Sequence, residues 1–181
     1  MTQLNFLPQF PIDASPLALL RRAVREANRA IRRLVEAEPA LNGMETTLVA
    51  LQLRGAQAAL AHVGDSRIYL LRAGKLHGLT LDHSMVADLV AYRRLSPAAA
   101  LRHPQRHVIT RALGVQPALE PDVALLLVER GDLFLLCTDG ISAALEEDEI
   151  ARVLSDAGAD LDAAADQLIA LANDHGGDDN A

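Results

Sequence analysis

Between residues 46 and 72 the chain consists of short apolar runs separated by turn residues, and this spacing constrains the fold more than any other feature. The runs 46–53, 56–63 and 67–72 are six to eight residues long, which is the usual length of a strand. Arg54-Gly55 and Gly64-Asp65-Ser66 separate them, and Gly and Asp favour tight turns. The pattern predicts an antiparallel meander.

Helical periodicity precedes and follows these runs. Ser15 followed by Pro16 is a favourable helix start, and this first helix is expected to end before Pro39. Strands and helices are therefore grouped along the chain, which favours an α+β fold with antiparallel sheets. Further strands are predicted over 122–129 and 132–137, and further helices over 84–94, from Ser96, over 146–158 and over 160–176. The apolar face predicted for the first helix consists of Leu20, Ala23, Ala27, Ala30, Ile31 and Leu34.

The composition fits one globular domain. Half of the 181 residues are hydrophobic but only 3% are aromatic, so the core is expected to be built from Leu, Ile, Val and Ala. The net charge of −7 and the lack of a long basic cluster argue against a nucleic-acid partner. A single Cys excludes an internal disulfide. We find no signal-peptide pattern and no apolar run of membrane-spanning length; the expectation is a cytoplasmic protein without a membrane partner, with residues 1–14 as an irregular tail.

Three acidic residues in Gly-rich turns are the candidates for chemistry. They are Asp65 in HVGDSR, Asp139 in CTDG and Asp179 in GGDDNA. Each alone is accounted for as a turn residue, because Asp stabilises turns by bonding its own backbone. Three of them after or near apolar segments indicate a site for a hard cation, since Mg2+ and Mn2+ prefer carboxylate oxygens.

Other catalytic chemistries find less support. The six histidines show no HxH or HExxH spacing, which disfavours zinc, and His62 is interpreted as a core or surface residue of a strand. Ser66 and Ser84 lack the Gly-x-Ser-x-Gly context of a nucleophile. Cys137 lies in an apolar run and is interpreted as a small buried hydrophobe. The chain has no Gly-rich phosphate-binding loop.

Several motifs in order resemble the bacterial metal-dependent protein phosphatases of the PPM family. The strings that carry the resemblance are AHVGDSRIYLLRAGKLHGLTLDHS, HPQRHVITRALG, RGDLFLLCTDGIS and GGDDN, and the likeness runs from about Ala23 to Ala181. The preceding GMETTLVA is similar to the family's Gly-Met-Gly-Thr-Thr signature. Glu45 stands where that signature has its middle glycine, which is a potential disturbance of a tight backbone turn.

The resemblance implies a fold, a reaction and a set of ligands. The family fold is a sandwich of two antiparallel β-sheets flanked by helices, with a two-metal site at one end. Its members use Mn2+ or Mg2+ and an activated water to remove phosphate from phosphoserine and phosphothreonine proteins, opposing a serine/threonine kinase, without a phosphoenzyme intermediate. By motif, Asp139 and Asp179 would ligate the metal pair. Asp65 would join Asp139 at the additional metal that bacterial members bind.

The chain also departs from the family pattern. The family motifs Arg-x-x-Asn-Glu-Asp and Asp-Gly-Met-Gly-Gly do not occur in it, and it stops at Asn180-Ala181, where the family continues into a closing strand. We therefore expect residues 1–181 to form one partial phosphatase domain that lacks the N-terminal metal motifs and the final strand. No residue is assigned as catalytic, and the chain as it stands is expected to be inactive. The alternative is a non-catalytic module that keeps the fold and binds a phosphoprotein or another partner without turnover.

Overall fold

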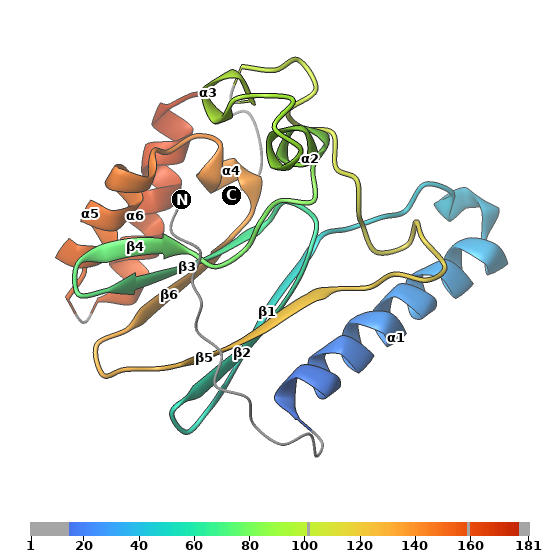
Figure 1. Ribbon diagram of the computed structural model, residues 1–181, viewed down its shortest axis with the longest axis horizontal. Coiled ribbons are helices and arrows are strands. Elements are labelled where there is room, and N and C mark those ends of the chain that lie inside the picture. The colour runs from blue at the N-terminus through green and yellow to red at the C-terminus, as the bar shows by residue number, and fades with distance from the viewer. Residues whose placement is uncertain (1–14, 101, 159, 178–181) are drawn as a thin grey trace. The chain divides into compact units, whose positions relative to one another are not determined.

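A computed structural model describes residues 15–100, 102–158 and 160–177 of the chain. These residues fall into two compact units. Of the described residues, the first unit contains those up to Val63 together with Arg111–Glu129, and the second contains those from Gly64 to Thr110 and from Arg130 onward. Figure 1 shows the elements of both units.

The first unit is a three-stranded antiparallel sheet with one long helix. Its strands are β1 (Leu48–Arg54), β2 (Gln57–Val63) and β5 (Asp122–Leu127), in the order β1-β2-β5. Helix α1 (Pro16–Ala37) packs against β2 and β5, and the short helix η1 (Pro39–Leu41) follows it. Alanines fill much of the central strand, which lets the helix approach closely. The core of this unit is formed by Val24, Ala61, Val63, Leu113 and Leu119.

Helix α1 begins as the sequence predicts, but its buried face is rotated from the predicted one. The Ser15 hydroxyl accepts a hydrogen bond from the Ala18 N–H at 3.3 Å, which caps the helix. Val24 and Asn28 are the buried residues of the helix, and Leu20, Ala27 and Ile31 pack against the same core. The prediction is wrong for Ala23, Ala30 and Leu34, which are exposed. The reason is that Asn28, a polar residue outside the predicted apolar face, is buried. Its side chain binds the loop before β5, so the helix turns this side toward the core.

The second unit is another three-stranded antiparallel sheet with five helices. Its strands are β3 (Arg67–Arg72), β4 (Lys75–Gly78) and β6 (Leu133–Cys137), in the order β4-β3-β6. Helices α4 (Asp139–Ser142), α5 (Glu147–Asp156) and α6 (Leu161–Asp174) pack beside this sheet. Helices α2 (Met85–Ala91) and α3 (Pro97–Ala100) lie in the segment between β4 and β5. The core is formed by Leu71, Ile141, Leu145, Ile150, Val153, Leu154, Ala164, Leu168 and Ala172.

The α+β class and the two antiparallel sheets flanked by helices are confirmed, whereas the consecutive meander is wrong. Strands β2 and β3 follow one another in the chain but belong to different sheets, and so do β5 and β6. Among the described strands, the turns that close hairpins are those at Gly55 and Gly74, which join β1 to β2 and β3 to β4. At Gly64, with φ of +107°, the chain leaves one sheet and enters the other. The left-handed backbone at this position favours glycine.

No helix within the described ranges has both the length and the apolar character that a membrane crossing requires.

Candidate metal site

The pairing of β3 with β6 brings Asp65 and Asp139 to the same end of the second sheet. Arg67 lies opposite Cys137 in this antiparallel pair. Asp65 precedes Arg67 by two residues, and Asp139 follows Cys137 by two residues. In an antiparallel pair the start of one strand lies beside the end of the other. The two carboxylates are therefore neighbours in space although they are far apart in sequence.

The electrostatics of Asp65 agree with this placement. Burial raises the pKa of the Asp65 carboxyl above its usual value, and the negative charge of Asp139 is the next largest cause. The charge of Asp82 also raises this pKa, while a backbone hydrogen bond and the cation of Arg67 lower it. Two carboxylates in electrostatic range of each other, one of them partly desolvated, form a site that a divalent cation would stabilise.

A buried histidine holds the turn that carries Asp65. The His83 N–H donates to the Gly64 carbonyl at 2.7 Å, and the Gly64 N–H donates to His83 Nδ1 at 3.1 Å. His83 is 2% exposed, and Gly64 is buried as well. Because Nδ1 accepts a hydrogen bond, the neutral ring carries its proton on Nε2. His83 thus positions the Asp65 turn, a role that its spacing from the other histidines does not reveal.

Arg67 is bound on the other side of the same turn. Its Nε and Nη2 atoms donate to the two Asp82 carboxylate oxygens, each at 2.8 Å, and its Nη1 donates to the Tyr69 hydroxyl at 3.0 Å. This bidentate geometry is the strong form of an Arg–carboxylate contact. Arg67 and Asp82 therefore act as positioning residues at the start of β3. The signal for them in the sequence was their place in the motif that runs from Ala61 to Ser84.

Asp139 occupies the junction between β6 and helix α4. Thr138 is the residue before the helix, in an extended conformation, and Asp139 is the first helical residue. Burial raises the pKa of the neighbouring Cys137 thiol to about 11, so the thiol stays protonated at neutral pH. Cys137 also packs against the core of the second unit. Cys137 is only partly buried, so its interpretation as a small buried hydrophobe holds in part.

The donor set fits a hard cation but supplies only part of its ligands. Asp65 and Asp139 offer carboxylate oxygens, which suit Mn2+ and Mg2+. Among the described residues, no group of three or more His, Cys, Asp or Glu side chains is placed to hold a metal. Asp179 lies outside the described residues, so its approach to Asp139 remains a prediction. His62 is buried in β2, in line with its interpretation as a core residue.

The potential disturbance at Glu45 is absent. Ala73 and Arg93 are the residues other than glycine with a positive φ in the described part of the chain, so Glu45 is not in the left-handed region. The next residue, Thr46, exchanges two backbone hydrogen bonds with Leu113, at 3.2 and 2.9 Å. The turn accepts a glutamate because its side chain is exposed to solvent.

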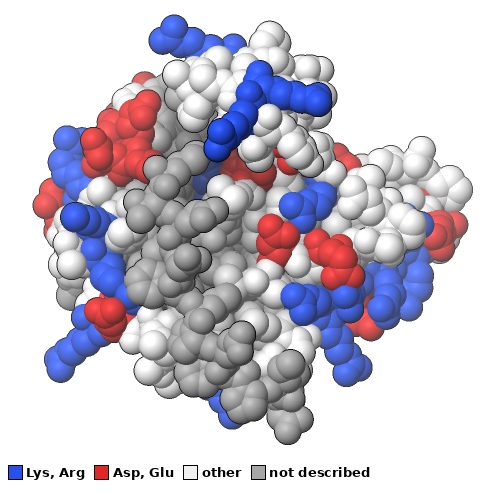
Figure 2. All heavy atoms as spheres, viewed as in Figure 1, with Lys and Arg blue, Asp and Glu red and all other residues white. Residues whose placement is uncertain are grey.

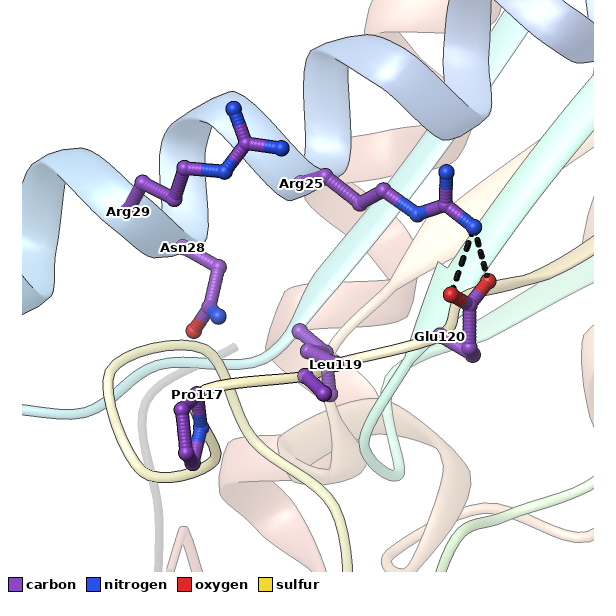
Figure 3. A pocket seen from close by; sticks show the side chains of 7 residues that line it. Arg25, Asn28, Arg29, Pro117, Leu119 and Glu120 are labelled. Atoms are coloured by element: carbon purple, nitrogen blue, oxygen red, sulfur yellow. Dashed lines mark hydrogen bonds and ion pairs between the residues drawn. The ribbon is translucent and has the colours of Figure 1, made fainter.

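A separate pocket of about 410 Å³ lies in the first unit, between α1 and the loop before β5. Figure 3 shows Arg25 reaching across it to Glu120, with the Arg25 Nη2 atom 2.7 Å from Glu120 Oε2. Asn28 donates from Nδ2 to the Gln116 carbonyl and accepts from the Gly114 N–H through Oδ1, each at 2.8 Å. These contacts fasten the loop to the helix. The pocket is therefore interpreted as part of the structural contact between α1 and the loop before β5.

The fold and the motif order are shared with a known class of proteins, and comparison with known proteins gives the family. The chain belongs to the protein phosphatase 2C family, whose family model matches residues 4–171. It is similar to the serine/threonine phosphatase stp of Listeria monocytogenes, with 40% identity over 161 residues, which are 89% of this chain and 64% of that protein. It is also similar to the serine/threonine protein phosphatase PstP of Mycobacterium tuberculosis, with 43% identity over 164 residues, 91% of this chain and 31% of that protein.

Solved structures give the same result. The crystal structure of the Mycobacterium tuberculosis serine/threonine phosphatase PstP/Ppp matches with a TM-score of 0.86 at 43% identity, covering 91% of this chain and 68% of that chain. A structure of the PstP catalytic domain in complex with two manganese ions matches with a TM-score of 0.83 at 39% identity, covering 94% of this chain and 70% of that chain. The chain thus spans about two thirds of the length of these structures.

Proposed function

We propose that this chain is part of a metal-dependent phosphatase that hydrolyses phosphoserine and phosphothreonine in proteins. The observation that carries the proposal is the β3–β6 register, which delivers Asp65 and Asp139 to one end of a sheet. The relatives at about 40% identity that are named serine/threonine phosphatases support the same activity.

The metals of the proposal are Mn2+ or Mg2+, and a related catalytic domain is known with two manganese ions. Asp65, Asp139 and Asp179 are the residues of this chain that would hold them. Bound divalent cations lower the pKa of water and neutralise charge on phosphoryl oxygens. Other residues of this chain hold the Asp65 carboxylate in place. His83 and the Arg67–Asp82 pair fix the turn that carries Asp65.

The proposed partners follow from the chemistry. A phosphatase of this kind needs proteins phosphorylated on serine or threonine, and only a kinase of that specificity produces them. We therefore propose a serine/threonine kinase as the opposing enzyme and the cytoplasm as the place where both act.

For the 181-residue chain on its own we propose little or no turnover. Hard cations take about six oxygen ligands in fixed geometry, and a two-metal phosphatase site holds its ions about 3.5–4 Å apart. The three aspartates supply only a part of such a shell. With Mn2+, the chain is expected to hydrolyse p-nitrophenyl phosphate and a phosphothreonine peptide no faster than its Asp139→Asn variant.

A chimera tests the activity itself. It joins residues 15–181 to the segments of the Mycobacterium tuberculosis relative that align before and after them. We expect the chimera to hydrolyse the phosphothreonine peptide in a Mn2+-dependent reaction that Asp139→Asn abolishes. A folded chimera without Mn2+-dependent activity would contradict the proposal. If that inactive chimera still bound the phosphopeptide, the result would favour a non-catalytic binding module.

A further inference from the structure

The segment of residues 84–110 differs in charge from the rest of the molecule. It contains Arg93, Arg94, Arg102 and Arg106 and one carboxylate, Asp88, so its net charge is +3 in a chain of net charge −7. No acidic residue occurs between Asp88 and Glu120. We call these four residues the arginine surface. Figure 2 shows Lys and Arg side chains in blue over α2 and α3, at the top of the view.

The arginine surface is available for binding. All four arginines are exposed, and within the described ranges none of the four guanidinium groups has a hydrogen bond or an ion pair. Within the same unit, Arg67 and Arg72 are bound to carboxylates. Tyr92, beside Arg93, is 75% exposed, which adds an aromatic face to the same surface.

The backbone at Arg93 is unusual for a residue other than glycine. Helix α2 ends with the Arg93 N–H bound to the Val90 carbonyl at 2.9 Å and the Arg94 N–H bound to the Leu89 carbonyl at 2.8 Å. This is the Schellman ending, which places its C′ residue in the left-handed region and favours glycine there. The chain has Arg93 at that position, with φ of +55°. The Arg93 side chain has no hydrogen bond or ion pair within the described residues, so no contact of the side chain accounts for the strained backbone, and such strain points to function.

The segment is joined to the turn that carries Asp65 through His83. His83, which precedes it, binds the Gly64 backbone next to Asp65. Its two ends are paired with each other, since the Met85 N–H donates to the Val108 carbonyl at 2.9 Å and the Thr110 N–H donates to the His83 carbonyl at 2.7 Å. The segment therefore belongs to the same unit as Asp65 and Asp139, and a phosphopeptide held there through divalent cations would have it as a neighbouring surface.

We propose that the arginine surface selects phosphoproteins with acidic residues next to the phosphorylated serine or threonine. The inference rests on the proposed function, whose site it extends with a substrate class. Aspartate and glutamate side chains of the substrate pair with guanidinium groups that have no partner within the described residues. A peptide is favoured over nucleic acid or an anionic membrane because the strongly acidic remainder of the chain repels extended polyanions.

Binding of fluorescent peptides to the 181-residue chain tests the inference without requiring turnover. The peptides have phosphothreonine at the centre and acidic, neutral or basic flanks, and each has an unphosphorylated counterpart. At low salt we expect the acidic-flank peptides to bind about tenfold more tightly than the neutral ones, a gain of several exposed ion pairs. The preference should fall steeply at high salt. Equal affinities for acidic and neutral flanks would overturn the inference.

Three variants test whether the preference for acidic peptides comes from the arginine surface. Replacing the four residues of the arginine surface by Gln is expected to remove the preference, whereas Arg22→Gln/Arg33→Gln, a pair of exposed arginines on α1, should keep it. Arg93→Gly should weaken acidic-peptide binding about two- to threefold while raising the melting temperature by about 2 °C, because glycine relieves the left-handed backbone. A weaker affinity in a more stable protein cannot result from unfolding.

Two outcomes separate this inference from the proposed function. If the chimera hydrolyses phosphopeptides but the four-residue variant keeps its preference for acidic flanks, only the inference is overturned. If the preference is present in the unphosphorylated peptides but the chimera has no Mn2+-dependent activity, the arginine surface is supported and the phosphatase proposal fails. Loss of binding to DNA or anionic vesicles in the four-residue variant, with no peptide preference in the wild type, would assign the surface to a different ligand and overturn the inference.

Discussion

Arg72 and Asp132 form a bidentate ion pair that closes one end of the β3–β6 pair. The Arg72 Nε atom lies 2.8 Å from Asp132 Oδ1, and its Nη2 atom lies 2.6 Å from Oδ2. The Asp132 side chain is 1% exposed and that of Arg72 is 25% exposed. The pair sits at the opposite end of the two strands from Asp65 and Asp139, because Leu71 is opposite Leu133 in the register.

The first prediction is that Arg72→Ala destabilises the protein by about 3 kcal/mol, because it leaves the buried Asp132 carboxylate without its cation. The matched control is Arg111→Ala. The Arg111–Asp122 pair has a similar contact distance of 2.8 Å, but its side chains are 37% and 56% exposed, so its loss should change stability by less than about 1 kcal/mol. Urea unfolding of both variants measures the difference. Equal losses would contradict the role that we assign to burial.

A second prediction concerns Asn28, which joins helix α1 to the loop before β5. The side chain is 1% exposed and bonds Gln116 and Gly114, residues nearly ninety positions away. Asn28→Ala removes both buried hydrogen bonds between the helix and the loop, so we expect a loss of about 2–4 kcal/mol. Arg29→Ala on the next position of the helix is the control, because Arg29 is exposed and its one ion pair among the described residues is with Glu26; it should cost about 0.5 kcal/mol or less.

A third prediction tests the space around Gly114. This residue has φ of +95°, and an added Cβ would lie 2.5 Å from the Met44 carbonyl oxygen and 2.8 Å from Ile31 Cγ2. Gly55 also has a positive φ, of +59°, but an added Cβ there meets nothing within 4 Å. Gly55→Ala should therefore cost only the left-handed conformation, about 1 kcal/mol. Gly114→Ala should cost at least about 3 kcal/mol, because a steric clash is added. Thermal unfolding of the two variants gives the comparison.

Local features of the sequence predicted much of this fold. The start of α1 at Ser15, the hairpin at Gly55 and the turn position of Asp65 each depend on a few adjacent residues. The sheet to which each strand belongs was not predictable in the same way. All positions of β2 from Ala58 to Val63 are buried, so the strand has no alternation of polar and apolar residues that would indicate one solvent face.

The contacts between residues far apart in the sequence also could not be predicted from neighbouring residues. Asn28 is polar and lies on an arginine-rich helix, so nothing nearby in sequence predicts its burial; its partners are in a loop that only the fold brings close. The rotated face of α1 has the same cause. His83 and Asp82 support the Asp65 turn through contacts that depend on the return of the chain after β4. The motifs predicted the candidate site, whereas the residues that support it could be identified only from the structure.

The last prediction separates the metal-binding role of Asp139 from a structural one. Without metal, the Asp139 carboxylate opposes the ionisation of the partly buried Asp65, as its effect on the Asp65 pKa indicates. Asp139→Asn removes that repulsion, so the metal-free variant should be as stable as the wild type or slightly more stable. Mn2+ should stabilise the wild type by mass action, by about 2.7 kcal/mol at a hundred times its dissociation constant, and should have little effect on the variant.

Ser142→Ala in the same helix α4 is the control, and its response to Mn2+ should match that of the wild type. Thermal unfolding with and without Mn2+ measures all three proteins. A variant that is strongly destabilised without metal but still stabilised by Mn2+ would show that Asp139 supports the fold and does not bind the ion.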